Sequence, residues 1–219
     1  MNTETTTTNT RNSRQLKRFT AIFGGTFDPI HNAHLALANE VLSKDLADEV
    51  MFVPAAKPPH KLEKKITAAE DRLEMIKLVL EDNPAFAVSD YEVINKKKTS
   101  YTVNTLRALQ TAYPERRFKL IVGMDNFRDM DSWYNYQEII NNFDLIIFSR
   151  PGTIQPSFGQ IQEKFGPKAA NKLMDSIISD ISIDISSTNI RQLLNEGQEL
   201  TDLVPAKVAQ YIEENGLYT

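Results

Sequence analysis

Two of the three histidines in the chain, His31 and His34, follow a glycine-containing segment and are three residues apart. If both lie in the first turn of a helix, their rings share one face, with Cβ atoms roughly 5 to 6 Å apart. Two imidazoles facing one point could bind an anion such as a phosphate. Zinc binding is the competing use, but H-x-x-H without an obvious third ligand is a weak zinc signal. For either histidine taken alone, packing or helix capping is the alternative.

The segment that contains these histidines has the composition of a phosphate-binding turn. It follows the apolar run Phe19 to Phe23 and reads Gly24-Gly25-Thr26-Phe27-Asp28-Pro29-Ile30-His31-Asn32-Ala33-His34. The glycines let a ligand approach the backbone, and Asp28-Pro29 resembles a helix cap followed by a first-turn proline. A helix N-terminus here would offer N–H groups to an anion. The G-x-G-x-x-G and G-x-x-x-x-G-K-[ST] patterns are both missing, which argues against a dinucleotide-dependent oxidoreductase and a Walker-type ATPase.

This segment resembles the G-[GT]-F-[DN]-P-x-H-x-G-H signature of the nucleotidylyltransferase superfamily. These enzymes transfer a nucleotidyl group from a nucleoside triphosphate to a phosphorylated acceptor and release pyrophosphate. Ala33 stands where the family usually has glycine, a small change that a helix tolerates. The resemblance implies that His31 and His34 are catalytic and donate to the α- and β-phosphates. It also assigns ATP binding to Gly24, Gly25, Thr26 and Phe27.

A second motif, Ser186 to Arg191, follows the apolar run Ile181 to Ile185. Its three successive hydroxyl residues mark a helix N-terminus, and simple capping is the alternative to ligand contact. A cation in the first turns opposes the helix dipole by about 0.3 to 1 kcal/mol unless an anion lies between them. The motif resembles I-S-[ST]-T-x-[IV]-R of the same superfamily, which implies a catalytic Arg191 at the leaving pyrophosphate. The resemblance likewise implies ATP binding by Ser186, Ser187 and Thr188.

The region between the two motifs is expected to select the acceptor. Tyr101 to Leu106, Gly123 to Asp125 and Trp133 resemble the Y-T-x-x-T-L, G-x-D and downstream Trp elements of bacterial nicotinate mononucleotide adenylyltransferases. That resemblance extends from Ala21 to Tyr218. It implies AMP transfer from ATP to nicotinate mononucleotide, which gives nicotinate adenine dinucleotide (deamido-NAD) and pyrophosphate in NAD biosynthesis.

Chemistry is consistent with this choice of acceptor. An indole face suits a flat, electron-poor nicotinate ring, although Trp133 could equally be a half-buried packing residue. The nicotinate carboxylate needs hydroxyl and N–H donors such as those around Thr102. Asp125, after a glycine at a strand's carboxyl end, is well placed for a ribose hydroxyl and is assigned to the ATP site.

Basic residues elsewhere complete the expected acceptor site. Lys57 and His60 lie in a stiff loop, Lys57 to Lys61, that resembles a P-x-x-P-H-[KR] segment bordering the acceptor pocket in that family. This resemblance implies that they help neutralise the acceptor phosphate, whereas a solvated loop is the alternative. Arg150, after the fifth expected strand, is assigned to the mouth of the site. Mg²⁺ is expected to bind mainly through the ATP phosphates, without a metal site in the protein.

Three other functions are alternatives to this transfer. Nicotinamide mononucleotide differs from the acid only at the carboxylate end and stays an alternative acceptor. Pantetheine-phosphate adenylyltransferases usually have Thr in place of the first histidine, and cytidylyltransferases carry R-Y-V-D-E and R-T-x-G-I-S-T-T patterns that this chain does not have. A non-catalytic nucleotide sensor is the alternative from another class, but a sensor needs no site for a leaving pyrophosphate.

The fold that positions these residues can be predicted from the pattern of apolar residues. Short apolar runs read as strands alternate with helical patterns, which predicts an α/β fold: a Rossmann-like, doubly wound parallel sheet with helices on both faces. Expected strands are Phe19 to Phe23, Glu49 to Val53, Phe86 to Val88, Arg117 to Val122, Phe143 to Phe148 and Ile181 to Ile185. Expected helices are Asn32 to Ser43, Thr67 to Leu80 with a Thr67 to Glu70 capping box, Tyr101 to Tyr113, and Pro205 to Glu214.

Length, charge and composition limit the class of protein that this chain can be. The 219 residues carry a net charge of −4 and are 41% hydrophobic, which argues against nucleic-acid binding and for one substantial core. We expect a Thr/Asn-rich disordered tail at 1–17 and a single domain over 18–219. No apolar run has the length of a bilayer span or the position of a signal peptide, so neither membrane association nor export is expected. Without cysteine there is no disulfide or thiolate chemistry. A cytoplasmic location is the expectation, and homo-oligomers remain an open alternative.

Overall fold

The protein is built around a parallel sheet of six strands in the order β3-β2-β1-β4-β5-β6. The computed structural model describes residues 18–59, 66–81, 83–149, 152–178, 186–198, 200 and 202–218. The strands are β1 (Phe19–Gly25), β2 (Glu49–Pro54), β3 (Phe86–Val88), β4 (Arg117–Gly123), β5 (Asp144–Phe148) and β6 (Ile177–Ile178). This order confirms the doubly wound sheet, and its direction of winding reverses between β1 and β4. In open α/β sheets of this kind, ligands bind where the winding reverses, beyond the carboxyl ends of the strands.

Both faces of the sheet are covered, which explains the unbroken apolar runs of its strands. Along β1, Ala21 and Phe23 join one core while Ile22 joins the other, since successive side chains of a strand face opposite sides. All six residues of β2 are buried.

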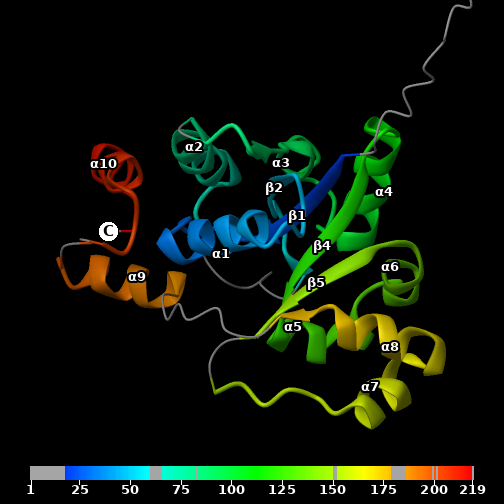
Figure 1. The fold of residues 1–219 in the computed structure, drawn as a ribbon. Helices are drawn as coiled ribbons and strands as arrows, with labels where there is room; N and C mark the ends of the chain where they lie inside the picture. The colour runs from blue at the N-terminus through cyan, green and yellow to red at the C-terminus, as the bar shows by residue number, and fades with distance from the viewer. Residues whose placement is uncertain are drawn as a thin grey trace, which may run out of the picture.

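Figure 1 shows α1, α9 and α10 on one side of the sheet and α4, α6 and α8 on the other. The first layer contains α1 (Asn32–Ser43), α2 (Ala69–Leu80), α9 (Ser187–Asn195) and α10 (Ala206–Glu214). The second contains α4 (Thr102–Ala112), α5 (Met124–Arg128), the 3-10 turn η2 (Met130–Ser132), α6 (Tyr136–Asn142), α7 (Phe158–Phe165) and α8 (Pro167–Asp175). The short α3 (Tyr91–Ile94) packs Val93 against α2.

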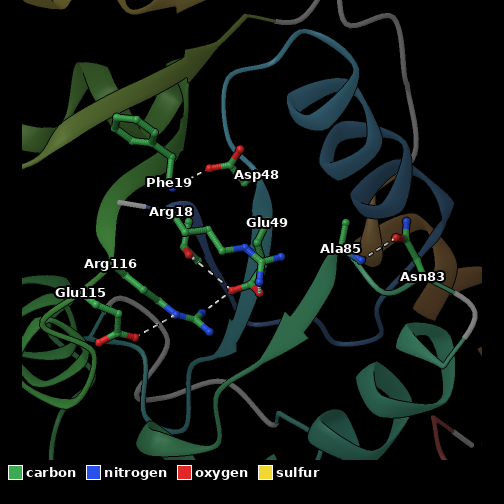
Figure 2. Close-up of polar contacts among 9 residues, drawn as sticks. Arg18, Phe19, Asp48, Glu49, Asn83, Ala85, Glu115 and Arg116 are labelled. Atoms are coloured by element: carbon green, nitrogen blue, oxygen red, sulfur yellow. Dashed lines mark hydrogen bonds and ion pairs between the residues drawn. The ribbon is translucent and has the colours of Figure 1, made fainter. Parts of the chain in front are cut away.

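A buried carboxylate ties together the amino ends of the three central strands (Figure 2). Glu49, at the start of β2, forms ion pairs with Arg18 before β1, at 3.3 Å, and with Arg116 before β4. The main-chain N–H of Phe19 donates to Asp48 at 2.7 Å. These contacts hold together the amino ends of the strands, which lie opposite the carboxyl ends where ligands bind in such folds.

Helix α1 has the predicted bounds, whereas the expected start of α2 and the expected cap before α1 were wrong. Helix α2 begins at Ala69, and its N-cap, Ala68, has no side chain that could accept a hydrogen bond. The Thr67 side chain instead hydrogen-bonds Tyr218, and the Thr67 carbonyl accepts from Arg72 Nε at 2.9 Å. Asp28-Pro29 does not open α1, whose N-cap is His31; Asp28 is buried and hydrogen-bonded elsewhere.

The expected strand Ile181 to Ile185 and the tail 1–17 lie outside the described residues. The sixth described strand, β6, was not predicted. No helix in the described ranges is long and apolar enough to cross a membrane.

Candidate active site

A cavity of about 560 Å³ lies at the carboxyl ends of β1 and β4, where the winding of the sheet reverses. Residues from both sequence motifs line it, together with residues from the segment between them. The expected site residues among its lining are Gly24, Gly25, Thr26, His31, His34, Thr102, Asp125, Trp133, Ser186, Ser187, Thr188 and Arg191. Segments separated by about 150 residues of chain therefore meet around one space.

The histidine pair opens α1, with His31 as N-cap and His34 in the first turn. Their rings are stacked, with centroids 3.6 Å apart and planes inclined by 22°. The His31 main-chain N–H donates to Nδ1 of His34 at 3.2 Å. Because Nδ1 accepts, the neutral His34 ring carries its proton on Nε2, and that edge of the ring is a hydrogen-bond donor.

The second motif forms the N-terminus of α9, as predicted. The Ser186 hydroxyl accepts from the Asn189 N–H at 3.2 Å, so at least one of the hydroxyl residues is a helix cap. Arg191, in the second turn, donates through Nη1 to the main-chain oxygen of Asp28 at 2.7 Å and through Nη2 to Thr188 Oγ1 at 3.2 Å. The two motifs thus contact each other directly.

Two described residues of the expected site, Phe27 and Lys57, are not among the residues that line the cavity. Phe27 is only 2% exposed and packs edge-to-face on the rings of Phe23 and His34, so it supports the site from beneath. Lys57 is exposed and is not among the lining residues, although the adjacent Pro58 is. His60 and Arg150 lie outside the described residues.

The two glycines of the first motif have different surroundings. A Cβ added at Gly25 would lie 2.9 Å from Phe27 Cζ, whereas one at Gly24 would meet no described atom within 4 Å. A side chain at position 25 would clash with the Phe27 ring, so this position requires glycine. At Gly24 the space that a side chain would fill is open and could be taken by a ligand. Ala33, the departure from the family signature, also lines the cavity.

Sequence reasoning missed several polar residues at this site. Asp28 lines the cavity, although its sequence context suggested a helix cap. Glu92 also lines it and accepts from Thr105 Oγ1 at 2.6 Å. Arg72, 1% exposed, donates to the Thr26 main-chain oxygen from beneath the loop. A charged residue among the apolar positions of α2 was the available signal for Arg72, whereas nothing in the local pattern marked Glu92.

Comparisons with known proteins identify the family of the chain. Residues 22–193 match the model of the cytidylyltransferase-like family. A probable nicotinate-nucleotide adenylyltransferase of Geotalea daltonii is 41% identical over 209 residues, covering 90% of this chain and 96% of the relative. One of Clostridium acetobutylicum is 42% identical over 199 residues, with 90% and 98% covered.

Solved structures support the fold. The Plasmodium falciparum nicotinic acid mononucleotide adenylyltransferase complexed with NaAD superposes with a TM-score of 0.74 at 21% identity, covering 92% of this chain and 97% of the other. The family match spans most of the chain, and the sequence relatives are covered almost end to end. This chain therefore belongs to the cytidylyltransferase-like family and, within it, to the nicotinate-nucleotide adenylyltransferases.

Proposed function

We infer that this protein transfers AMP from ATP to nicotinate mononucleotide, forming nicotinate adenine dinucleotide and pyrophosphate in NAD biosynthesis. The observation that carries this inference is one cavity lined by His31, His34 and Arg191 together with Thr102 and Trp133. Paired imidazoles and a guanidinium suit a polyphosphate, and a hydroxyl beside an indole suits an aromatic acid.

The chemistry requires positioning more than proton transfer. An oxygen of the acceptor phosphate, already anionic at neutral pH, attacks the α-phosphorus of ATP; the bond from that phosphorus to the bridging oxygen breaks, and its electron pair leaves on pyrophosphate. No general base is needed, so catalysis comes from alignment and from neutralising charge on the phosphoryl oxygens.

Each group at the cavity has a role in this proposal. His31 and His34 donate to the α- and β-phosphates, for which the Nε2–H tautomer of His34 is suited. Thr26 and Ser186 orient the triphosphate, and Arg191 stabilises the departing pyrophosphate. Thr102 and Trp133 hold the nicotinate group, and Asp125 binds a ribose hydroxyl. By the family resemblance, Lys57 and His60 are assigned to the acceptor phosphate and Arg150 to the mouth of the site; of these three only Lys57 is among the described residues, and it is not part of the cavity lining.

Mg²⁺ belongs to this proposal as part of the nucleotide substrate. Among the described residues no three His, Asp or Glu side chains gather to hold a metal, and Mg²⁺ commonly binds nucleotides through phosphate oxygens with few protein ligands. When bound there, it would neutralise charge on the triphosphate. We also propose a cytoplasmic location, where ATP and pyridine nucleotides are available.

One assay tests the activity and its acceptor. Purified protein is incubated with ATP, Mg²⁺ and nicotinate mononucleotide, and pyrophosphate and dinucleotide are quantified together. We expect equal amounts of the two products. Absence of pyrophosphate would favour a nucleotide sensor and overturn the function. Parallel rates with nicotinamide mononucleotide and pantetheine phosphate test the acceptor, and a higher kcat/KM with either would overturn the choice of nicotinate.

A further inference from the structure

The loop between β1 and α1 is held by side chains that come from distant parts of the chain. Its main-chain oxygens accept hydrogen bonds at successive points. Arg72 of α2 donates to Thr26 O, Arg191 of α9 donates to Asp28 O, and Ser187 of α9 donates to Pro29 O at 3.2 Å. The shape of this loop therefore depends on α2 and α9 as well as on its own sequence.

The backbone at Phe27 needs such support. Phe27 adopts a φ of 49°, in the left-handed region, which costs a bulky residue about 1 to 3 kcal/mol and persists only where the surroundings impose it. The carbonyls on either side of Phe27 are those held by Arg72 and Arg191. Without these contacts, the loop would relax toward a more common conformation and would move Gly24 to Thr26.

A buried polar cluster beneath the loop connects it to the C-terminal segment. Arg72 is 1% exposed and Asp28 is 4% exposed. Burial lowers the pKa of Arg72, and the nearby Asp28 carboxylate opposes that shift. The Tyr218 hydroxyl donates to Asp28 Oδ1 at 2.8 Å, across 190 positions of sequence. Burial raises the pKa of Tyr218, so its hydroxyl stays a protonated donor at neutral pH.

We propose that Arg72 and Tyr218 are positioning residues for the nucleotide site, acting through Thr26 and Asp28 to keep the 24–29 loop in its phosphate-receiving shape. Neither Arg72 nor Tyr218 is among the residues that line the cavity, whereas Thr26 and Asp28 are. The C-terminal segment thus helps to shape the active site through the hydrogen bond from Tyr218 to Asp28. The identity of the ligand as ATP rests on the proposed function.

Tyr211 offers a matched control for this idea. Its hydroxyl donates to Asp71 Oδ1 at 3.0 Å and joins α10 to α2, but it does not contact the loop. Both tyrosines are half-buried and both donate to a carboxylate. Tyr218→Phe and Tyr211→Phe therefore each remove a hydrogen bond donated to a carboxylate, and only the first removes one from the loop. Tyr218→Phe also removes the hydrogen bond between Tyr218 and Thr67, which lies before α2 and outside the loop.

The experiment compares these two variants with the full-length wild-type protein. It measures thermal stability, kcat and KM for each substrate, and binding of an ATP analogue with a methylene group between its α- and β-phosphates. We expect a loss in Tm for both variants, larger for Tyr218→Phe because Tyr218 is the more buried hydroxyl and has two partners. Tyr218→Phe should lower kcat/KM for ATP about tenfold, equivalent to about 1.4 kcal/mol, and weaken analogue binding, while KM for nicotinate mononucleotide stays within about twofold. Tyr211→Phe should match the wild type in all kinetic constants.

Equal kinetic constants and equal analogue affinity for the two variants would overturn the positioning role, as would an equal decline in both. The analogue separates this proposal from the proposed function. If the wild type forms no pyrophosphate but Tyr218→Phe alone weakens analogue binding, the loop role stands and the transfer activity fails. If the wild type is active and Tyr218→Phe retains its full kcat/KM for ATP, the loop role fails alone.

Discussion

Arg191 Nη1 donates to the main-chain oxygen of Asp28 at 2.7 Å, joining two turns that are 163 residues apart in sequence. Arg191 lies near the N-terminus of α9, where a cation opposes the helix dipole. The Asp28 carbonyl provides part of the compensation. The same guanidinium lines the cavity, so it can hold the loop and contact an anion at once.

Arg191→Lys should lower kcat about 100-fold, because a single ammonium cannot serve the Asp28 carbonyl and the leaving pyrophosphate with the geometry of a planar guanidinium. Steady-state kinetics with saturating substrates measures this effect. Arg107→Lys is the control, since Arg107 forms an exposed ion pair with Glu138 and does not line the cavity. A change of less than threefold in Arg191→Lys would contradict the role.

His34→Ala should cut turnover by about 100-fold or more, equivalent to about 2.7 kcal/mol, through loss of a donor to the phosphates. It should also lower stability by about 1 kcal/mol, because the His31 N–H loses its acceptor. His34→Asn separates the two effects: its amide oxygen can cap the helix, so stability recovers while turnover stays low. Recovery of turnover in the Asn variant would assign His34 to capping alone.

Gly25→Ala should lower stability, whereas Gly24→Ala should weaken ATP binding. The added Cβ at Gly25 meets the buried Phe27 ring at 2.9 Å, so we expect a loss of about 1 to 3 kcal/mol in unfolding free energy. At Gly24 the new methyl points into open space, so stability should be unchanged and KM for ATP should rise. Chemical denaturation and steady-state kinetics test the pair. Equal stability loss in both variants would contradict the distinction.

Trp133→Ala should raise KM for the acceptor about 3- to 10-fold, as expected for losing an aromatic stack of about 1 kcal/mol, and leave KM for ATP unchanged. Trp133 lines the cavity and also packs partly against the second core, so Tm is recorded in parallel. Tyr134→Ala is the matched control, because Tyr134 is 51% exposed, its ring lies tilted against that of Tyr101, and it is not among the lining residues. An equal rise in acceptor KM for Tyr134→Ala would argue against stacking on Trp133.

The contribution of Tyr218 to stability should depend on alkaline pH. Its pKa is raised in the folded protein, mainly by burial, above the ordinary value of 10.0. The contribution is therefore fully present below about pH 10 and is lost as pH rises toward the folded-state pKa. The difference in unfolding free energy between wild type and Tyr218→Phe should be constant from pH 7 to 9 and shrink above pH 10. A constant difference through pH 11 would contradict the buried hydrogen bond.

The sequence by itself determined the features that depend on local pattern. Apolar runs predicted β1 through β5 within one or two residues, because strands covered on both faces are mainly apolar. The spacing of His31 and His34 predicted that their rings would meet, since residues three apart on a helix are neighbours. The two family motifs then indicated a polyphosphate between turns that the sheet topology brings to one edge.

Only the tertiary structure decided which buried polar groups meet. From local sequence, Asp28 resembles a helix cap, yet in the folded protein its carboxylate accepts a hydrogen bond from Tyr218 and lies near Arg72. Thr67 was expected to cap α2 through its hydroxyl, yet the N-cap is Ala68 and the Thr67 side chain hydrogen-bonds Tyr218. Burying a guanidinium and a carboxylate without partners would cost several kcal/mol, which outweighs a cap worth about 1 kcal/mol. Such pairings depend on how the helices pack against the sheet. The periodicity of apolar residues predicts which face of an element is buried but not which distant polar groups meet.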